Sequence, residues 1–242
     1  MIYVCTVHHR APRWVRPQLE YLARHLSEPF RVHAVVDAVD PSPFDVALEA
    51  DVTQHGPRLN LLADDVIERG AADDDLLMFL DSDAFPIADP LPRVRAALAA
   101  GAVLVAARRN DGIGTPWPHP LFAVTTVGWW REHGDWQPGP LYLCDNGERW
   151  TDAGARLLEE LEHTRERWVG LTRTNPQRLH PLFFGIYGDL IYHHGAGSRR
   201  PISKTDVAAR GDMDERAERN RAIGDRLYRA LTRDPEFWKE LA

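Results

Sequence analysis

The sequence predicts an α/β fold in one domain, with a mainly parallel sheet flanked by helices. Apolar strand-like runs alternate with helix-like segments through the first hundred residues, a pattern typical of parallel strands joined by crossover helices. The chain has 242 residues, 44% of them hydrophobic, so it can bury a sizeable core without disulfides or a structural metal. The carboxyl ends of parallel strands meet at one edge of such a sheet, where ligands bind.

The individual elements of this half follow from hydrophobic spacing and from the residues that end each segment. Val15, Leu19, Leu22 and Leu26 recur at helical spacing, whereas short apolar runs without that spacing indicate buried strands. A glycine closes each of the two later helices. The expected strands are 2–7, 30–36, 76–80 and 102–107, and the expected helices are 14–26, 59–69 and 92–100.

The second half of the chain has a different composition from residue 110 onward. Glycines and prolines interrupt it, and five of the eight tryptophans fall between 117 and 150. We expect a loop-rich functional region there. Its aromatic faces suit sugar rings, although core packing is the commoner role of a single tryptophan. Beyond it the pattern predicts a helix at 152–163, a strand at 182–192 and a charged helix at 215–233.

Composition excludes several classes of partner and location. A net charge of −7 argues against a general affinity for nucleic acid. The two cysteines indicate no disulfide framework and fit a reducing compartment. No apolar run approaches the roughly 20 residues that span a bilayer, and the start lacks the basic region of a signal peptide. We therefore expect a cytoplasmic protein with no nucleic-acid partner and no integral membrane segment.

Two carboxylates follow the apolar run at 76–80. Asp81 and Asp83 stand two residues apart, so at the extended end of a strand their side chains project to the same side and can bind one cation. Mn²⁺ or Mg²⁺ held by such carboxylates keeps open positions for phosphate oxygens. The Asp-x-Asp pattern also occurs at 73–75 and 212–214, but neither copy follows an apolar run. The pair therefore points to chemistry on a phosphorylated substrate.

A second group of polar residues follows the strand expected to end at Tyr192. It reads His-His-Gly-Ala-Gly-Ser-Arg-Arg-Pro from His193 to Pro201. A neutral imidazole is a competent metal ligand, glycines let backbone N–H groups approach phosphate oxygens, and arginines offer planar donors. Adjacent residues of an extended strand point opposite ways, so only one of His193 and His194 can face a metal.

With these motifs in place, most of residues 1–205 resembles a nucleotide-sugar-dependent glycosyltransferase of the GT-A fold. That fold has a Rossmann-like, mixed, mainly parallel sheet. His194, Gly197, Arg200 and Pro201 stand at the His-x-x-Gly-x-x-Lys-Pro spacing of the glycogenin-type enzymes, with Arg for Lys and with Ile202 where that family has tryptophan. The resemblance implies a nucleotide-binding half at 1–109, an acceptor-binding and metal-completing half at 110–205, and a C-terminal helical segment at 206–242.

The same resemblance implies which residues bind the metal and the donor. His194 would complete a metal site with Asp81 and Asp83, and Arg199 and Arg200 would bind the diphosphate. Asp81 would reach the metal directly or through ribose and water. The nucleotide would lie near Thr6, His8 and Asp37, and a donor loop would supply Arg58 and Asn60. Two of these residues also have a purely structural explanation. Asp37 is a common turn former, and Asn60 is a residue typical of helix starts.

The expected activity is transfer of a sugar from a nucleoside diphosphate sugar, with UDP or GDP favoured, to a hydroxyl of a small-molecule or glycan acceptor. An inverting enzyme needs a base, for which Asp152 is the candidate and Asp135 and Asp145 are substitutes. A carboxylate at a helix start is equally expected on structural grounds, and a retaining enzyme needs no such base.

Two other functions are compatible with parts of the sequence. A haloacid-dehalogenase-type phosphohydrolase also has an apolar strand ending in Asp-x-Asp, but it expects Thr or Val where Phe85 stands. A non-catalytic nucleotide-sugar-binding protein would use the same fold and bind the donor without turnover.

Overall fold

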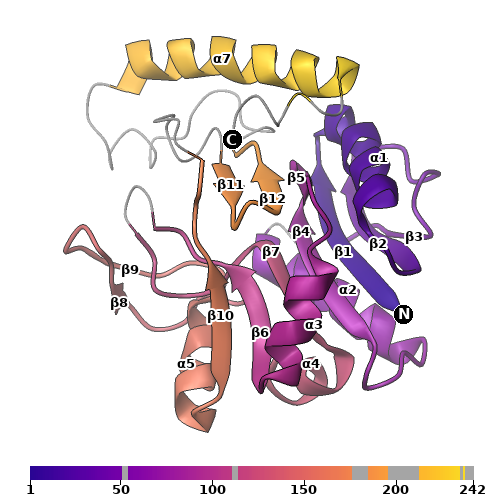
Figure 1. Cartoon of the computed structure of the whole chain (residues 1–242), viewed down its shortest axis with the longest axis vertical. Helices are drawn as coiled ribbons and strands as arrows, with labels where there is room; N and C mark the ends of the chain where they lie inside the picture. Colours follow the sequence, from indigo (N-terminus) through magenta and orange to yellow (C-terminus); the bar gives the residue numbers. More distant parts are fainter. Residues whose placement is uncertain (51–53, 111–113, 176–184, 196–212, 235–236, 238–242) are drawn as a thin grey trace.

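The fold is built on a seven-stranded sheet with the order β10-β6-β7-β4-β1-β2-β3 (Figure 1). The computed structural model describes residues 1–50, 54–110, 114–175, 185–195, 213–234 and 237, without the side chains of 213–221. The strands of the sheet are β1 (Ile2–His9), β2 (Phe30–Asp37), β3 (Val46–Leu48), β4 (Leu76–Asp81), β6 (Ala102–Ala107), β7 (His119–Thr126) and β10 (Arg167–Leu171).

Six of the seven strands run in the same direction. The pairs β1–β2, β1–β4, β2–β3 and β6–β10 are parallel, whereas β7 runs antiparallel between β4 and β6. The mixed, mainly parallel sheet expected from the sequence is therefore confirmed. The carboxyl ends of β1, β2 and β4 meet at one edge, and Asp81 is the last residue of β4.

Helices cover both faces of the sheet. One apolar core joins the sheet to α1 (Val15–His25) and α3 (Leu91–Ala99). The other joins it to α2 (His55–Glu68), α4 (Val127–His133) and α5 (Ala155–Thr164). Met78 of β4 packs in the first core and Phe79 in the second. Because both faces of β4 are buried, its sequence is a continuous apolar run.

A small three-stranded sheet lies beyond the carboxyl ends of the main strands (Figure 1). Its order is β11-β12-β5, with β11 (Gly185–Tyr187), β12 (Ile191–His193) and β5 (Ala84–Pro86), all antiparallel. The helix α7 (Met213–Arg233) packs on it through a third core that includes Trp14 of η1 (Pro12–Trp14). A separate hairpin joins β8 (Tyr142–Leu143) to β9 (Arg149–Trp150).

The strand expected at 182–192 is wrong as a single element. The chain turns back between β11 and β12, with positive φ at Gly188 (60°) and Asp189 (58°), and residues 182–184 lie outside the described part. The hairpin places β12 beside β5, with His193 opposite Ala84. This pairing brings His193 to the turn that carries Asp83.

The expected loop-rich region between 110 and 150 contains elements that the sequence analysis missed: β7, α4 and the short hairpin strands β8 and β9. Pro118 and Pro120 obscured β7, although its residues from Pro120 to Thr125 are buried. Pro120 is tolerated because the pairing with β6 shifts register between Ala106 and Ala107. Most tryptophans of the region are core residues, as Trp117 and Trp136 are fully buried, whereas Trp150 is 40% exposed.

Within the described residues, no helix has the length and apolar character needed to span a membrane.

Candidate functional site

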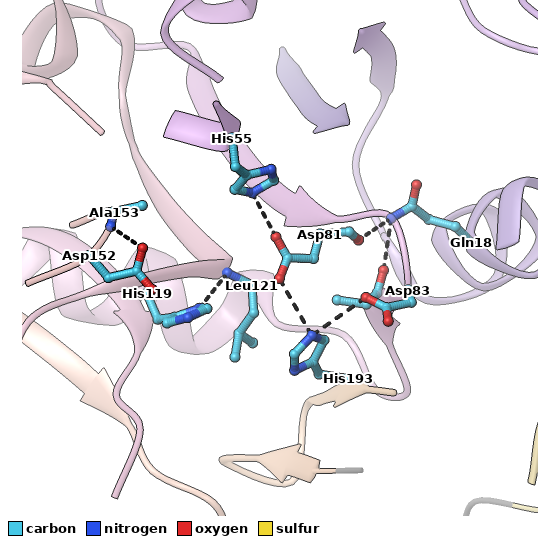
Figure 2. A network of polar contacts seen from close by, with 10 residues as sticks. Gln18, His55, Asp81, Asp83, His119, Leu121, Asp152, Ala153 and His193 are labelled. Atoms are coloured by element: carbon cyan, nitrogen blue, oxygen red, sulfur yellow. Dashed lines mark hydrogen bonds and ion pairs between the residues drawn. The ribbon is translucent and has the colours of Figure 1, made fainter. Parts of the chain in front are cut away.

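Three potential metal ligands converge at the carboxyl edge of the main sheet (Figure 2). Asp81 ends β4, Asp83 lies in the turn to β5, and His193 ends β12. Nε2 of His193 lies 3.4 Å from Oδ2 of Asp81 and 3.5 Å from Oδ1 of Asp83. One ligand atom from each residue falls within 4.8 Å of the others. Residues 110 positions apart in the chain thus form one cluster.

The three groups are strongly coupled in charge. Burial lowers the pKa of His193, but Asp83 and Asp81 outweigh that effect and raise it to about 9. Partial burial favours a higher pKa for Asp81, yet His193 and His55 hold it well below its usual range. The pKa of Asp83 is likewise lowered by His193 against the effect of its own burial. Two ionised carboxylates therefore lie close together, and one cationic imidazole lies near both of them.

The separations in this cluster fit one divalent cation. Ligand atoms about 2.1 Å from an octahedral ion lie about 3 Å apart at right angles and about 4.2 Å apart across it. The observed 3.4 and 3.5 Å distances from His193 fall within that range. Two carboxylates and one imidazole are also ligand types that Mn²⁺ and Mg²⁺ sites use. The donor set fits a divalent metal without identifying which.

His194, the ligand preferred in the sequence analysis, points away from this cluster. It is 4% exposed, its Nδ1 lies 2.8 Å from the hydroxyl of Tyr192, and its ring lies 4.6 Å from that of Trp14. Gly224 of α7 packs against its other nitrogen, where an added Cβ would come within 3.1 Å. The structure places His193, the alternative ligand, at the carboxylates. His193 ends β12 and His194 follows it, and the two neighbouring side chains point opposite ways, as expected.

Two polar residues that the sequence analysis did not single out as site residues support Asp81. Nε2 of His55 lies 2.9 Å from Oδ1 of Asp81, and Gln18 donates from Nε2 to the backbone oxygen of Asp81 (Figure 2). The sequence analysis expected this helix to begin at residue 59, with 55–60 as part of the donor loop, whereas α2 begins at His55, whose imidazole reaches Asp81. Nothing in the sequence distinguishes Gln18 from other residues of α1.

His119 is a third unpredicted polar residue near the cluster. Its Nδ1 accepts a hydrogen bond from the backbone N–H of Leu121 at 3.1 Å (Figure 2). Burial and Arg109 lower the pKa of His119 to about 3. The ring is therefore neutral, and its proton is on Nε2 because Nδ1 is occupied as an acceptor.

The expected nucleotide residues of β1 lie deep in the protein. Thr6 and His8 are fully buried, and Nε2 of His8 lies 3.0 Å from Oε1 of Gln18. The ring of Phe44 covers His8 with a centroid distance of 5.2 Å. Asp37 ends β2 and pairs with Nδ1 of His9 at 2.5 Å. Of these three residues, only Asp37 reaches the surface.

The two residues expected from the donor loop lie within α2. Arg58 is 7% exposed. Asn60 donates from Nδ2 to Asp135 at 2.7 Å, and its Oδ1 accepts from the backbone N–H of Trp136 at 2.9 Å. Both ends of its amide thus anchor the 135–136 loop to α2. Because α2 already begins at His55, Asn60 lies inside the helix, and the helix-start alternative is wrong.

The three carboxylates considered as bases occupy different surroundings. Asp152 is exposed just before α5, and its Oδ1 accepts from the N–H of Ala153 at 2.8 Å. Partial burial lowers the pKa of His55, while Asp81 and, more weakly, Asp152 raise it above its ordinary value, so Asp152 lies within electrostatic range of the cluster. Asp135 accepts from Asn60, and Asp145 packs over Gly114. Arg199 and Arg200 lie outside the described residues.

Comparison with known proteins gives matches among solved structures alone. Neither the protein-family models nor the curated proteins contain a match to this sequence. The mannosyltransferase PcManGT from Pyrobaculum calidifontis, solved with GDP-Man and Mn²⁺, is similar with a TM-score of 0.51 at 13% identity, over 73% of this chain and 57% of that chain. This chain therefore spans little more than half the length of that protein.

Two further structures show weaker likeness. TarS from S. aureus (residues 1–349), solved with UDP, has a TM-score of 0.39 at 14% identity, over 54% of this chain and 48% of its own. The galactosyltransferase LgtC, solved with donor and acceptor sugar analogues, has a TM-score of 0.40 at 13% identity, over 66% and 70%. At such low identity, the likeness to the mannosyltransferase shows the fold alone. The chain has the GT-A fold that the resemblance implied.

Proposed function

We propose that the chain is a metal-dependent glycosyltransferase that moves a sugar from a nucleoside diphosphate sugar to an acceptor hydroxyl. The convergence of Asp81, Asp83 and His193 at the carboxyl edge of the sheet carries this proposal. The fold is compatible with it, but one fold supports many chemistries, so the argument depends on the site. The cluster lies where open α/β sheets bind their ligands.

The proposed role of the cluster is to hold a cation against the donor diphosphate. A bound Mn²⁺ or Mg²⁺ supplies Lewis acidity that stabilises the negative charge of the departing nucleoside diphosphate. Asp81, Asp83 and His193 hold that cation, and His55 orients Asp81 through the 2.9 Å contact to its Oδ1. Without the cation, His193 lowers the pKa of Asp81 and of Asp83, so both are ionised; to bind the cation through Nε2, the ring of His193 must give up its proton.

Asp152 is the proposed base for the acceptor. Its Oδ1 is oriented by the N–H of Ala153, and its second oxygen can take the proton of an acceptor hydroxyl as that hydroxyl attacks the sugar. The residue is exposed, which suits access by a small-molecule or glycan acceptor. This assignment makes the reaction inverting, which NMR of the product anomer tests.

A binding screen identifies the nucleotide sugar that serves as donor. Thermal shifts are measured with UDP-, GDP- and dTDP-sugars, with and without Mn²⁺, starting with GDP-mannose because the mannosyltransferase was solved with it. We expect one nucleotide class to stabilise the protein only when metal is present. That donor should then release free nucleoside diphosphate in the presence of an acceptor. No metal-linked stabilisation, binding without turnover, or release of phosphate from aryl phosphates would each contradict the proposal.

A further inference from the structure

The side-chain amide of Gln18 is fully buried beneath the metal-binding turn. Its Nε2 donates two hydrogen bonds, to the backbone oxygens of Asp81 and of Ala84, each 2.8 Å long. Its Oε1 lies 3.0 Å from Nε2 of His8. Gln18 therefore connects α1 to β1 and to both ends of the turn between β4 and β5. Figure 2 shows its contact with Asp81.

The chemistry of these partners fixes the orientation of the amide. Backbone carbonyl oxygens accept but cannot donate, so the NH₂ group of Gln18 must face Asp81 and Ala84. Its Oε1 then faces His8, whose Nε2–H donates to it. Burial lowers the pKa of His8 to about 4, so the ring is neutral and has one N–H to give. Both donors of the amide are used, as expected for a buried polar group.

The two carbonyls that Gln18 binds belong to or adjoin all three potential ligands. The carbonyl of Asp81 belongs to one ligand, and Asp83 lies between the two bonded residues. Ala84 pairs with His193 across β5 and β12. Tyr21, one turn further along α1, packs on Phe85 with ring centroids 4.4 Å apart, which fixes the helix over β5. One buried amide thus binds the backbone beside ligands that come from two separate strands.

We propose that Gln18 is a positioning residue for the metal site, holding the β4–β5 turn in the shape that lets Asp81, Asp83 and His193 bind one cation. The inference rests on the proposed metal site and adds a residue that does not itself touch the metal. An apolar side chain of similar length at position 18 would leave two carbonyls without their donor and free the turn to change shape. Loss of an outer-shell partner typically costs about 10- to 100-fold in metal affinity.

The test is the Mn²⁺ dissociation constant of the protein, measured by isothermal titration calorimetry and by the EPR signal of free Mn²⁺ without nucleotide sugar. We expect Gln18→Met to weaken Mn²⁺ binding by about 10- to 100-fold. If Gln18→Met fails to fold, Gln18→Glu provides the same test, because it keeps the size and the acceptor for His8 but turns an oxygen toward the two carbonyls. We expect the same loss of affinity from it.

A matched control removes a buried hydrogen bond elsewhere. Thr125 of β7 is fully buried and donates from Oγ1 to the backbone oxygen of Val103 at 2.7 Å. Thr125→Val should lower stability and leave the Mn²⁺ affinity within about twofold of wild type, because Thr125 pairs with Leu77 near the start of β4.

The experiment distinguishes failure of the Gln18 inference from failure of the proposed function. An unchanged Mn²⁺ affinity in a folded Gln18 variant, beside wild-type protein that binds Mn²⁺, would overturn this inference alone. Equal losses in the Gln18 and Thr125 variants would also overturn it, since the effect would then follow stability rather than positioning. Wild-type protein that binds no Mn²⁺ would overturn both this inference and the proposed function.

Discussion

Replacing His193 with alanine tests whether His193, rather than the adjacent His194, binds the metal. The change removes an imidazole whose Nε2 lies 3.4 Å from Oδ2 of Asp81 and 3.5 Å from Oδ1 of Asp83. A residue that only orients a ligand is worth about 10- to 100-fold in metal affinity. Loss of a ligand itself should cost more than about 100-fold, which is about 2.8 kcal/mol at 1.4 kcal/mol for each factor of ten.

The matched control is His194→Gln, and the assay is calorimetric titration with Mn²⁺. His194 contacts Tyr192 and Trp14 rather than the carboxylates. Its replacement should therefore lower the melting temperature and change the Mn²⁺ dissociation constant by less than about threefold. A large loss of affinity in His194→Gln, with His193→Ala close to wild type, would refute the assignment drawn from the structure. The ligand preferred in the sequence analysis would then be right.

Three further predictions address the surrounding residues. His55→Gln should weaken Mn²⁺ binding by about 10- to 100-fold, because Nε2 of His55 lies 2.9 Å from Asp81; titration checks this, and an unchanged affinity would count against a supporting role. Asp152→Asn should lower kcat by about 10²- to 10⁴-fold while Mn²⁺ affinity stays constant; a wild-type kcat with retained anomeric configuration would exclude Asp152 as the base. Burial lowers the pKa of His8 to about 4, below the roughly 6.5 of an unfolded chain, so protons bind the unfolded state first and stability falls as pH drops through this interval. Protonation linked to His8 should lower the free energy of unfolding by about 2 kcal/mol between pH 7 and pH 5. Urea denaturation of the metal-free protein measures this change. In His8→Gln the fall between these two pH values should be smaller by that amount.

The framework of the fold could be predicted because its signals are local. The apolar run of β4 is continuous since its two faces enter two separate cores, and the capping glycines mark helix ends directly. The carboxylates of Asp81 and Asp83 could be placed for the same reason, as the residues that follow a buried strand. These predictions needed no knowledge of distant partners.

The remaining features depend on pairings that the sequence does not display. His193 faces the carboxylates because the chain turns back at Gly188, between β11 and β12, and β12 then aligns with β5. This register decides which of two adjacent histidines points toward the carboxylates. Gln18 acquires its role only when α1 packs over the β4–β5 turn. The central strand β7 was hidden by Pro120, whose place beside a register shift is a tertiary property.

The position of a bound Mn²⁺ ion tests the proposed metal site most directly. Crystals are grown with Mn²⁺ and the nucleoside diphosphate chosen by the thermal-shift screen, and the ion is located from its anomalous scattering. We expect one peak within bonding distance of Asp81, Asp83 and His193 that also contacts the diphosphate. A peak elsewhere, or a diphosphate bound with no ion at these three side chains, would contradict it.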